Sequence, residues 1–321
     1  MRCAILDDYQ NVALSMTDWA ALAGRIDLTV FNTHFADEDA CAEAIRDCEI
    51  VVAMRERTPF TASLLSRLPR LRLLATTGRM NAAIDLQEAD ARGIVVCGTR
   101  AALHTTAEMT WALILALARH IPREDANLRA GGPWQVGIGI DLHGKTLGLL
   151  GLGTLGGQMA RIGLAFGMRV IAWSSNLTAE RCAECGVALV SKDALIAEAD
   201  VLSIHTRLSA RTRGLIGAAE LRRMKRSAFL VNTARGFIVD EAALIDALEA
   251  GLIAGAGLDV YERAPLPPDH PLRRSRNTVL TPHLGYVTEQ SYRIFFEDVV
   301  ADIEAWLDGS PIRVLTPTGT T

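Results

Sequence analysis

The stretch GLGTLG, which spans Gly151 to Gly156, decides the fold of this chain. It follows the apolar run KTLGLL and leads into TLGGQMARIGLAF, so the glycines stand between a predicted strand and a predicted helix. The first glycine permits a tight turn, the second lets the main chain approach a pyrophosphate, and the third lets helix and strand pack closely. Free N–H groups at the start of the helix favour phosphate. The predicted dinucleotide-binding residues of this turn are Gly151, Gly153, Thr154, Leu155 and Gly156.

Short β-branched runs alternate with segments of helical spacing on both sides of this turn, which is typical of parallel α/β sheets. The runs before the turn are CAILD, DLTVF, IVVAM, LRLLATT and GIVVC. From the turn onward they are KTLGLL, MRVIAWS, VALV, ADVLSIH, SAFLVNTA, AGAGLDV and TVLTPH. The predicted fold class is therefore α/β, with two Rossmann-like domains built on doubly wound parallel sheets.

A long apolar segment, HTTAEMTWALILALARHI, separates the two series of runs. Thr105 stands three residues before Glu108, which predicts a capping box at the start of a buried connecting helix. The last helical segment, from about Thr288 to Leu307, is predicted to return to the first domain. We therefore expect a discontinuous first domain at residues 1–101 and 286–321, and a dinucleotide-binding domain at residues 102–285.

Composition excludes several classes of function. The 321 residues are 50% hydrophobic and 22% charged, which is enough apolar material for the cores of two domains. The 33 basic and 37 acidic residues give a net charge of -4 without a basic block, so no nucleic-acid partner is expected. No apolar run approaches the ~20 residues that cross a bilayer. The N-terminal segment lacks the features of a signal peptide, so we expect no membrane association and a cytoplasmic location.

The six cysteines are scattered along the chain, which favours reduced thiols over a disulfide framework. Cys182 and Cys185 form a C-x-x-C, but no second pair completes a zinc site. We interpret both as ordinary helix residues and expect no metal.

The strand after the glycine-rich turn bears on the choice between NAD and NADP. An acidic residue at the end of this strand usually binds the ribose 2′-hydroxyl of NAD. Here MRVIAWSSN ends in Ser174 and Ser175, so no carboxylate repels a 2′-phosphate, and the nearest arginine, Arg181, is not adjacent. We therefore expect NAD(H) or NADP(H) as cofactor, with NADPH bound at least comparably to NADH.

Five blocks of the chain resemble, in order and spacing, the D-isomer-specific 2-hydroxyacid dehydrogenases, the family of glyoxylate/hydroxypyruvate reductases and phosphoglycerate dehydrogenases. These blocks are GKTLGLLGLGTLG, ADVLSIHTRLSARTRGLIG, FLVNTARGFIVDEAAL, GLDVYERAPLP and NTVLTPHLGYVT. The resemblance implies a two-domain fold, in which the discontinuous first domain is the substrate (catalytic) domain, and a homodimer built around the connecting helix. It also implies reversible hydride transfer between a nicotinamide cofactor and the CH–OH or carbonyl group of a small 2-oxo/D-2-hydroxy acid, such as glyoxylate or hydroxypyruvate. Which acid it is stays open.

The resemblance implies roles for individual residues as well. Arg235 is expected to bind the substrate carboxylate and the reacting oxygen, and His283 to donate or accept a proton at that oxygen. Taken singly, Arg235 could be a surface ion-pair partner and His283 a hydrogen-bonded loop histidine. Beyond the turn, the expected cofactor contacts are Ser174, Ser175, His205, Thr206, Thr233, Ala234, Asp259 and Gly285.

One residue departs from the family pattern. The family has a glutamate five positions after the aspartate of the LDV block, where it hydrogen-bonds the catalytic histidine, and here that position is Ala264. Alanine cannot favour the imidazolium, so the alternative is a non-catalytic or weakly active NAD(H)-binding protein of the same fold. Glu262 is the nearest acid in sequence, and whether it substitutes for the missing glutamate stays open.

Two segments are candidates for substrate contacts. The segment TTGRMNAAID resembles the family's carboxylate-binding turn, which assigns Thr77, Gly78 and Arg79 to the substrate. Arg55, which follows the predicted strand IVVAM, is a further candidate for the distal group of the substrate. The alternative for Arg55 is a solvated surface arginine, which is the common case.

Overall fold

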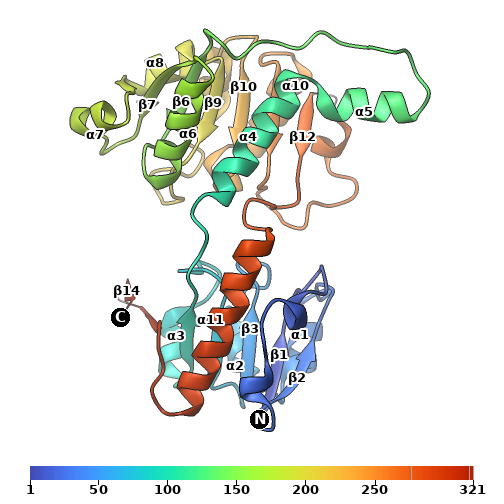
Figure 1. Ribbon diagram of the computed structural model, residues 1–321, viewed down its shortest axis with the longest axis vertical. Coiled ribbons are helices and arrows are strands. Elements are labelled where there is room, and N and C mark those ends of the chain that lie inside the picture. Colours follow the sequence, from blue (N-terminus) through green and yellow to red (C-terminus); the bar gives the residue numbers. More distant parts are fainter. Residues whose placement is uncertain (276, 318, 321) are drawn as a thin grey trace. The chain divides into compact units, whose positions relative to one another are not determined.

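The computed structural model describes residues 1–275, 277–317 and 319–320. These residues form two compact units, one made of Met1–Ala102 and Thr288–Thr321 and the other of Leu103–Val287. Figure 1 shows the first unit in blue and cyan with the red C-terminal helix, and the second in green to orange. Each unit contains its own parallel sheet with helices packed against it. The predicted α/β class with two Rossmann-like sheets is confirmed.

The first unit is built on a five-stranded parallel sheet with strand order β2-β1-β3-β4-β5. Its strands are β1 (Arg2–Ile5), β2 (Asp27–Val30), β3 (Ile50–Ala53), β4 (Leu73–Thr76) and β5 (Val95–Gly98). Its helices are η1 (Ala13–Ser15), η2 (Ala20–Leu22), α1 (Glu38–Ile45), α2 (Ala62–Ser66), α3 (Leu86–Ala91) and α11 (Glu289–Leu307). β13 (Leu315–Thr316) and β14 (Gly319–Thr320) form a short antiparallel pair after α11. Every residue of β3 and β4 is buried, as expected for parallel strands covered on both faces.

Helix α11 joins the end of the chain to the first unit. Thr288 caps its N-terminus by accepting a hydrogen bond from the N–H of Ser291. Its apolar face, with Phe295, Val299 and Ile303 fully buried, lies on the sheet near β4. In Figure 1 the red helix accordingly lies beside the blue strands, although the two are distant in sequence.

The second unit is built on a seven-stranded parallel sheet with strand order β12-β11-β10-β9-β6-β7-β8. Its strands are β6 (Thr146–Leu150), β7 (Arg169–Trp173), β8 (Ala188–Leu189), β9 (Val201–Ile204), β10 (Phe229–Asn232), β11 (Gly255–Leu258) and β12 (Thr278–Leu280). Its helices are α4 (Thr105–Ala118), α5 (Ile121–Arg129), α6 (Thr154–Ala165), α7 (Ala179–Glu184), α8 (Lys192–Glu198), α9 (Ala218–Arg223), α10 (Glu241–Glu249), η3 (Gly236–Ile238) and η4 (Pro271–Arg274). The strand order changes direction at β6, which pairs with β7 on one side and β9 on the other. Ligands of such sheets bind outside the carboxyl ends of the strands at this point.

Helix α4 differs in detail from the sequence prediction. His104 is its N-cap and makes no side-chain cap hydrogen bond, so the predicted capping box at Thr105 is wrong. Thr105 is already the first helical residue, and its buried hydroxyl has no hydrogen-bond partner among the described residues. The helix is buried as predicted and packs against α6, β10 and β11. It ends at Ala118, because His120 adopts a left-handed conformation (φ 53°) before the separate helix α5 begins.

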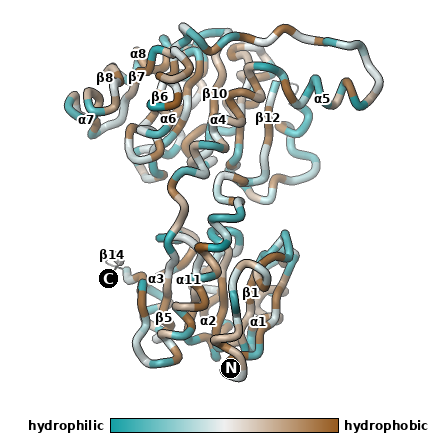
Figure 2. The backbone as a smooth tube through the Cα atoms, in the orientation of Figure 1, coloured by the Kyte–Doolittle hydropathy of each residue, from teal (hydrophilic) through white to brown (hydrophobic). Residues whose placement is uncertain are grey.

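Hydrophobic residues concentrate on the strands and on the helix faces that cover them (Figure 2). Helix α5 is the exception, because it has no buried residue and projects away from the sheet of its unit (Figure 1). Among the residues described, no helix combines the length and the apolar character needed to cross a membrane.

Candidate active site

The glycine-rich turn between β6 and α6 has the geometry of a phosphate cradle. Gly151 has a φ of +103°, and a Cβ there would lie 2.8 Å from the carbonyl oxygen of His205. A Cβ on Gly156 would overlap the carbonyl oxygen of Gly151, so this glycine lets helix and strand pack closely. A Cβ on Gly153, by contrast, would meet nothing within 4 Å. Gly153 is also the N-cap of α6 without a side-chain cap, which leaves the helix N-terminus open to an anion. These residues fit the pyrophosphate of a dinucleotide.

Two strand ends flank this turn. β7 is followed by Ser174, which is half-buried, and Ser175, which is exposed. Both side chains are uncharged hydroxyls. On the other side β9 runs into His205 and Thr206, both half-buried. The His205 Nε2 atom lies 2.8 Å from the hydroxyl of Ser203, and burial lowers the pKa of His205 to about 4. His205 is therefore neutral near pH 7, and its carbonyl oxygen faces the turn.

Arg235 lies just beyond the carboxyl end of β10, in a turn that is held by Asn232. The Asn232 side chain accepts a hydrogen bond from the N–H of Ala234 at 3.0 Å and donates one to the carbonyl oxygen of Arg235 at 3.0 Å. Arg235 is half-buried, and its guanidinium donates to the carbonyl oxygen of Ala234 at 2.8 Å. Buried Thr233 anchors the same turn to α4, because its hydroxyl lies 2.8 Å from that of Thr110.

His283 lies in the turn that follows β12 and has a left-handed backbone conformation, with a φ of 58°. Its ring packs edge-on against Tyr286, with 5.2 Å between the ring centroids. A residue other than glycine at positive φ is uncommon and concentrates at functional sites. The strained conformation needs support from neighbouring residues.

Asp259, at the carboxyl end of β11, provides that support. Its fully buried carboxylate accepts hydrogen bonds from the hydroxyl of Thr281 at 2.6 Å, the N–H of Leu284 at 2.7 Å and the N–H of Gly285 at 2.8 Å. Burial raises the pKa of the Asp259 carboxyl, and these hydrogen bonds oppose that rise. The carbonyl oxygen of Gly285 also accepts a hydrogen bond from Thr106 of α4. Asp259 thus holds the turn that carries His283.

The three residues stand on adjacent strands. β10, β11 and β12 are neighbours in the sheet, and Arg235, Asp259 and His283 follow their carboxyl ends. The glycine-rich turn lies at the same edge of the sheet, after β6. A cation, a buried carboxylate and an imidazole therefore share one sheet edge with the phosphate cradle, an arrangement suited to binding an anionic substrate and transferring a proton.

Glu262 and Ala264 lie in the exposed segment after β11. The Glu262 carboxylate accepts a hydrogen bond from the N–H of Glu241 at 3.3 Å, and its own N–H donates to the Glu241 carboxylate at 3.2 Å. Glu241 in turn lies 3.1 Å from Nε2 of His270. The Glu262 side chain therefore contacts the start of α10. The sequence leaves open whether Glu262 substitutes for the missing glutamate, and these contacts do not decide it.

The candidate substrate residues Arg55, Thr77, Gly78 and Arg79 all belong to the first unit, at the carboxyl ends of β3 and β4. Arg55 has a φ of 52°, and its N–H donates to the hydroxyl of Thr77 at 2.9 Å. Its guanidinium donates to the carbonyl oxygen of Thr77 at 3.3 Å and passes over Gly78, where a Cβ would overlap it. Arg79 is exposed. Arg55, and not Arg79, is thus the arginine held against this turn.

Two positioning residues were missed by the sequence reasoning. Asn81 donates from its amide to the carbonyl oxygen of Arg55 at 2.6 Å and to the hydroxyl of Thr76 at 2.8 Å, which supports the strained backbone of Arg55. Asn232 makes comparable hydrogen bonds in the turn of Arg235. For Asn232 the available signal was a polar residue that ends an apolar strand, whereas Asn81, five residues beyond the end of β4, gave no such signal. Within the described ranges, no group of three or more His, Cys, Asp or Glu residues could hold a metal ion.

Comparisons with known proteins identify the family and the fold. A family model, "D-isomer specific 2-hydroxyacid dehydrogenase, NAD binding domain", matches residues 111–285. The chain is 39% identical to a glyoxylate reductase from Korarchaeum cryptofilum over 274 residues, covering 83% of this chain and 82% of that protein. It is 46% identical to a glyoxylate reductase from Aeropyrum pernix over 237 residues, covering 71% of each. A solved structure of a putative D-3-phosphoglycerate dehydrogenase from Ralstonia solanacearum superposes with a TM-score of 0.93 at 38% identity, covering 99% of this chain and 97% of that one.

Proposed function

The chain belongs to the D-isomer specific 2-hydroxyacid dehydrogenases, and from this we propose that it reduces a small 2-oxo acid, such as glyoxylate or hydroxypyruvate, to the D-2-hydroxy acid. It is a nicotinamide-dependent oxidoreductase that acts on 2-hydroxy or 2-oxo acids. One observation carries the proposal for its site: Arg235, Asp259 and His283 follow adjacent strands at the sheet edge that holds the glycine-rich turn.

The chemistry divides among these residues. The nicotinamide cofactor, when bound, supplies or accepts the hydride. Arg235 offers a planar guanidinium to the substrate carboxylate and polarises the reacting carbonyl oxygen. His283 donates a proton to that oxygen in reduction and removes it from the hydroxyl in oxidation. Asp259 does not exchange protons in this scheme, because its buried carboxylate is committed to Thr281, Leu284 and Gly285.

Recognition of the cofactor rests on groups of the second unit. Gly151, Gly153 and Gly156 form the cradle for the pyrophosphate, and the first N–H groups of α6 complete it. Two strand ends flank this cradle, that of β7 with Ser174 and Ser175 and that of β9 with His205 and Thr206. These four residues are proposed to contact the adenosine half of the cofactor. Thr233, Ala234 and Gly285, near the candidate catalytic residues, are proposed to contact the nicotinamide half.

Arg55 is proposed to bind the distal part of the substrate, together with Thr77, Gly78 and Arg79. The support lies in the backbone of Arg55, which is held at a positive φ by hydrogen bonds to Thr77 and Asn81. Such a conformation costs about 1–3 kcal/mol and persists only where the surroundings enforce it. A solvated surface arginine needs no such support.

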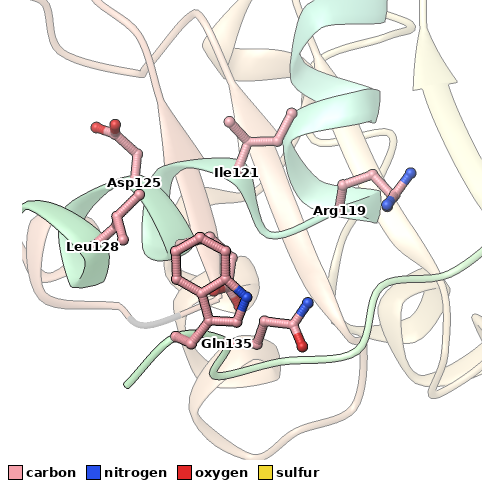
Figure 3. Close-up of a pocket in the computed structure, with 7 residues that line it drawn as sticks. Arg119, Ile121, Asp125, Leu128 and Gln135 are labelled. Carbon is pink, nitrogen blue, oxygen red and sulfur yellow. The ribbon is translucent and has the colours of Figure 1, made fainter. Parts of the chain in front are cut away.

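A homodimer is proposed through the segment that follows the connecting helix α4 and includes α5. Ile121, Leu128, Trp134 and Ile138 of this segment are 52%, 56%, 81% and 93% exposed. Ile121, Leu128 and Trp134 line an open groove of about 550 Å³ (Figure 3). Figure 3 shows Asp125 and Leu128 on one side of the groove and Gln135 on the other. Clustered apolar residues of this kind mark protein interfaces, and a second copy of the chain is the proposed occupant. A monomer mass measured by light scattering would contradict the dimer.

The cytoplasmic location of the protein stays a prediction.

A panel of 2-oxo acids assayed with NADH and with NADPH tests the substrate proposal. Glyoxylate and hydroxypyruvate should be reduced with a higher kcat/KM than 2-oxo acids with bulky side chains. A preference for a bulky 2-oxo acid would overturn the substrate class while leaving the family and the reaction type in place.

A further inference from the structure

We propose that Arg181 binds the 2′-phosphate of NADP(H), and that Glu184 competes with the phosphate for the same guanidinium. The inference rests on the proposed use of a nicotinamide cofactor and deepens it, because it names the residue that admits NADP(H). In sequence Arg181 lies well beyond the end of β7. In the structure its side chain reaches the glycine-rich turn.

The position of the guanidinium follows from two contacts. Its Nε atom donates a hydrogen bond to the carbonyl oxygen of Leu152, the residue between Gly151 and Gly153, at 3.2 Å. Its Nη2 atom would lie 3.1 Å from a Cβ placed on Gly157, in the first turn of α6. Arg181 therefore lies against the phosphate cradle, on the side of β7 and α7.

This side of the cradle is where the adenosine ribose is expected. In a Rossmann fold the strand that follows the glycine-rich helix ends beside the ribose 2′ position, and here that strand is β7. β7 is followed by Ser174 and Ser175, whose side chains are hydroxyls, so no carboxylate at the strand end repels a 2′-phosphate. Arg181 supplies a cation at the same edge, and a guanidinium binds phosphate through paired N–H groups.

Glu184 engages the guanidinium but leaves it available. Its carboxylate lies 2.8 Å from Nη1 of Arg181, and the two side chains are 42% and 64% exposed for Arg181 and Glu184 respectively. Exposed ion pairs of this kind contribute little to stability. A phosphate monoester carries close to two negative charges and three acceptor oxygens, so it is the stronger partner for the guanidinium. NADP(H) can therefore take Arg181 from Glu184, and Glu184 weakens NADP(H) binding.

Calorimetric dissociation constants for NADPH and NADH, and for the fragments 2′,5′-ADP and ADP, test this without any turnover. Arg181→Gln should weaken NADPH and 2′,5′-ADP by about tenfold or more and change NADH and ADP by less than about threefold. Arg181→Lys should retain part of the NADPH affinity. Glu184→Gln should tighten NADPH by about two- to threefold and leave NADH unchanged.

Arg169→Gln is the matched control. Arg169 forms a similarly exposed ion pair with Glu198, at 2.8 Å and at the opposite end of β7, so its removal should change neither dissociation constant. Equal weakening of NADPH and NADH in Arg181→Gln would mean that Arg181 only ties α7 to the turn, which overturns the inference. Arg207 is an exposed arginine that follows Thr206 beyond the carboxyl end of β9. A change of the NADPH/NADH ratio in Arg207→Gln but not in Arg181→Gln would also overturn the inference.

The failure of the inference is distinguishable from the failure of the cofactor proposal. If wild-type protein binds both dinucleotides and Arg181→Gln leaves their ratio unchanged, only the role of Arg181 is wrong. If wild-type protein binds neither dinucleotide, the proposed cofactor use fails and the role of Arg181 fails with it.

Discussion

The carboxylate of Asp259 accepts the main-chain N–H of Leu284 at 2.7 Å, and Leu284 is the residue that follows His283. The same carboxylate accepts hydrogen bonds from Thr281 and Gly285, so it holds the turn on both sides of the histidine. Asp259 itself is fully buried at the end of β11. It is therefore a positioning residue, and the imidazole of His283 depends on it for its place.

Asp259→Asn should destabilise the protein and lower kcat. The asparagine amide places a donor opposite main-chain donors, so at least one buried N–H loses its partner, at a cost of about 1–3 kcal/mol. Thr281→Val, which removes only the hydroxyl bond, should cost about 1 kcal/mol. Chemical denaturation and steady-state kinetics check both. An Asp259→Asn protein with wild-type stability and kcat would show that the turn of His283 does not depend on this carboxylate.

Two glycines of the cradle should respond in opposite ways to alanine. Gly153→Ala should lower the free energy of unfolding by no more than about 1 kcal/mol, because alanine is a poorer N-cap than glycine but its Cβ meets no protein atom. It should weaken NADH at least tenfold, because that Cβ stands where the pyrophosphate approaches. Gly156→Ala should cost about 2 kcal/mol or more, because its Cβ overlaps the carbonyl oxygen of Gly151. Denaturation and calorimetry separate the two effects. Unchanged NADH affinity in Gly153→Ala would place the cofactor elsewhere.

His205 should make the protein less stable in mild acid. Its folded-state pKa of about 4 lies below the ordinary value of 6.5, so between these two pH values the unfolded chain binds a proton that the folded chain does not. The free energy of unfolding should fall as the pH drops through this window, by on the order of 2 kcal/mol from this residue. His205→Gln should flatten the curve, whereas His143→Gln, at an exposed histidine, should not. Parallel curves for wild type and His205→Gln would contradict the expectation.

Much of the fold could be predicted from local sequence, because short apolar runs and glycine spacing encode strands and the turn that joins β6 to α6. The last helix, predicted from about Thr288, begins at Glu289 with Thr288 as its cap. Contacts between distant segments could not be predicted in this way. The reach of Arg181 to Leu152 and the path of Arg55 over Gly78 depend on how a side chain from one element meets the backbone of another. The capping box failed because a matching tetrapeptide does not determine at which residue the helix begins.

Ala264→Glu should raise kcat of reduction at neutral pH and move the falling limb of its pH profile upward, because a carboxylate beside His283 favours the imidazolium. The effect should vanish in the His283→Ala background. Glu262→Gln should leave the profile in place, since the Glu262 carboxylate contacts the N–H of Glu241 at the start of α10. A downward shift in Glu262→Gln would instead show that Glu262 acts on His283. Profiles unmoved by either change would mean that no carboxylate tunes this histidine.

The most direct test of the central claim compares binding with turnover in Arg235→Gln and His283→Gln. Both variants should bind NADH within about threefold of wild type by calorimetry, because the phosphate cradle lies on other strands. Both should reduce glyoxylate at least roughly 100-fold more slowly than wild type, since each loses a group that acts on the substrate in the transition state. Wild-type protein that binds NADH yet reduces no 2-oxo acid, or variants that reduce glyoxylate at the wild-type rate, would contradict the account.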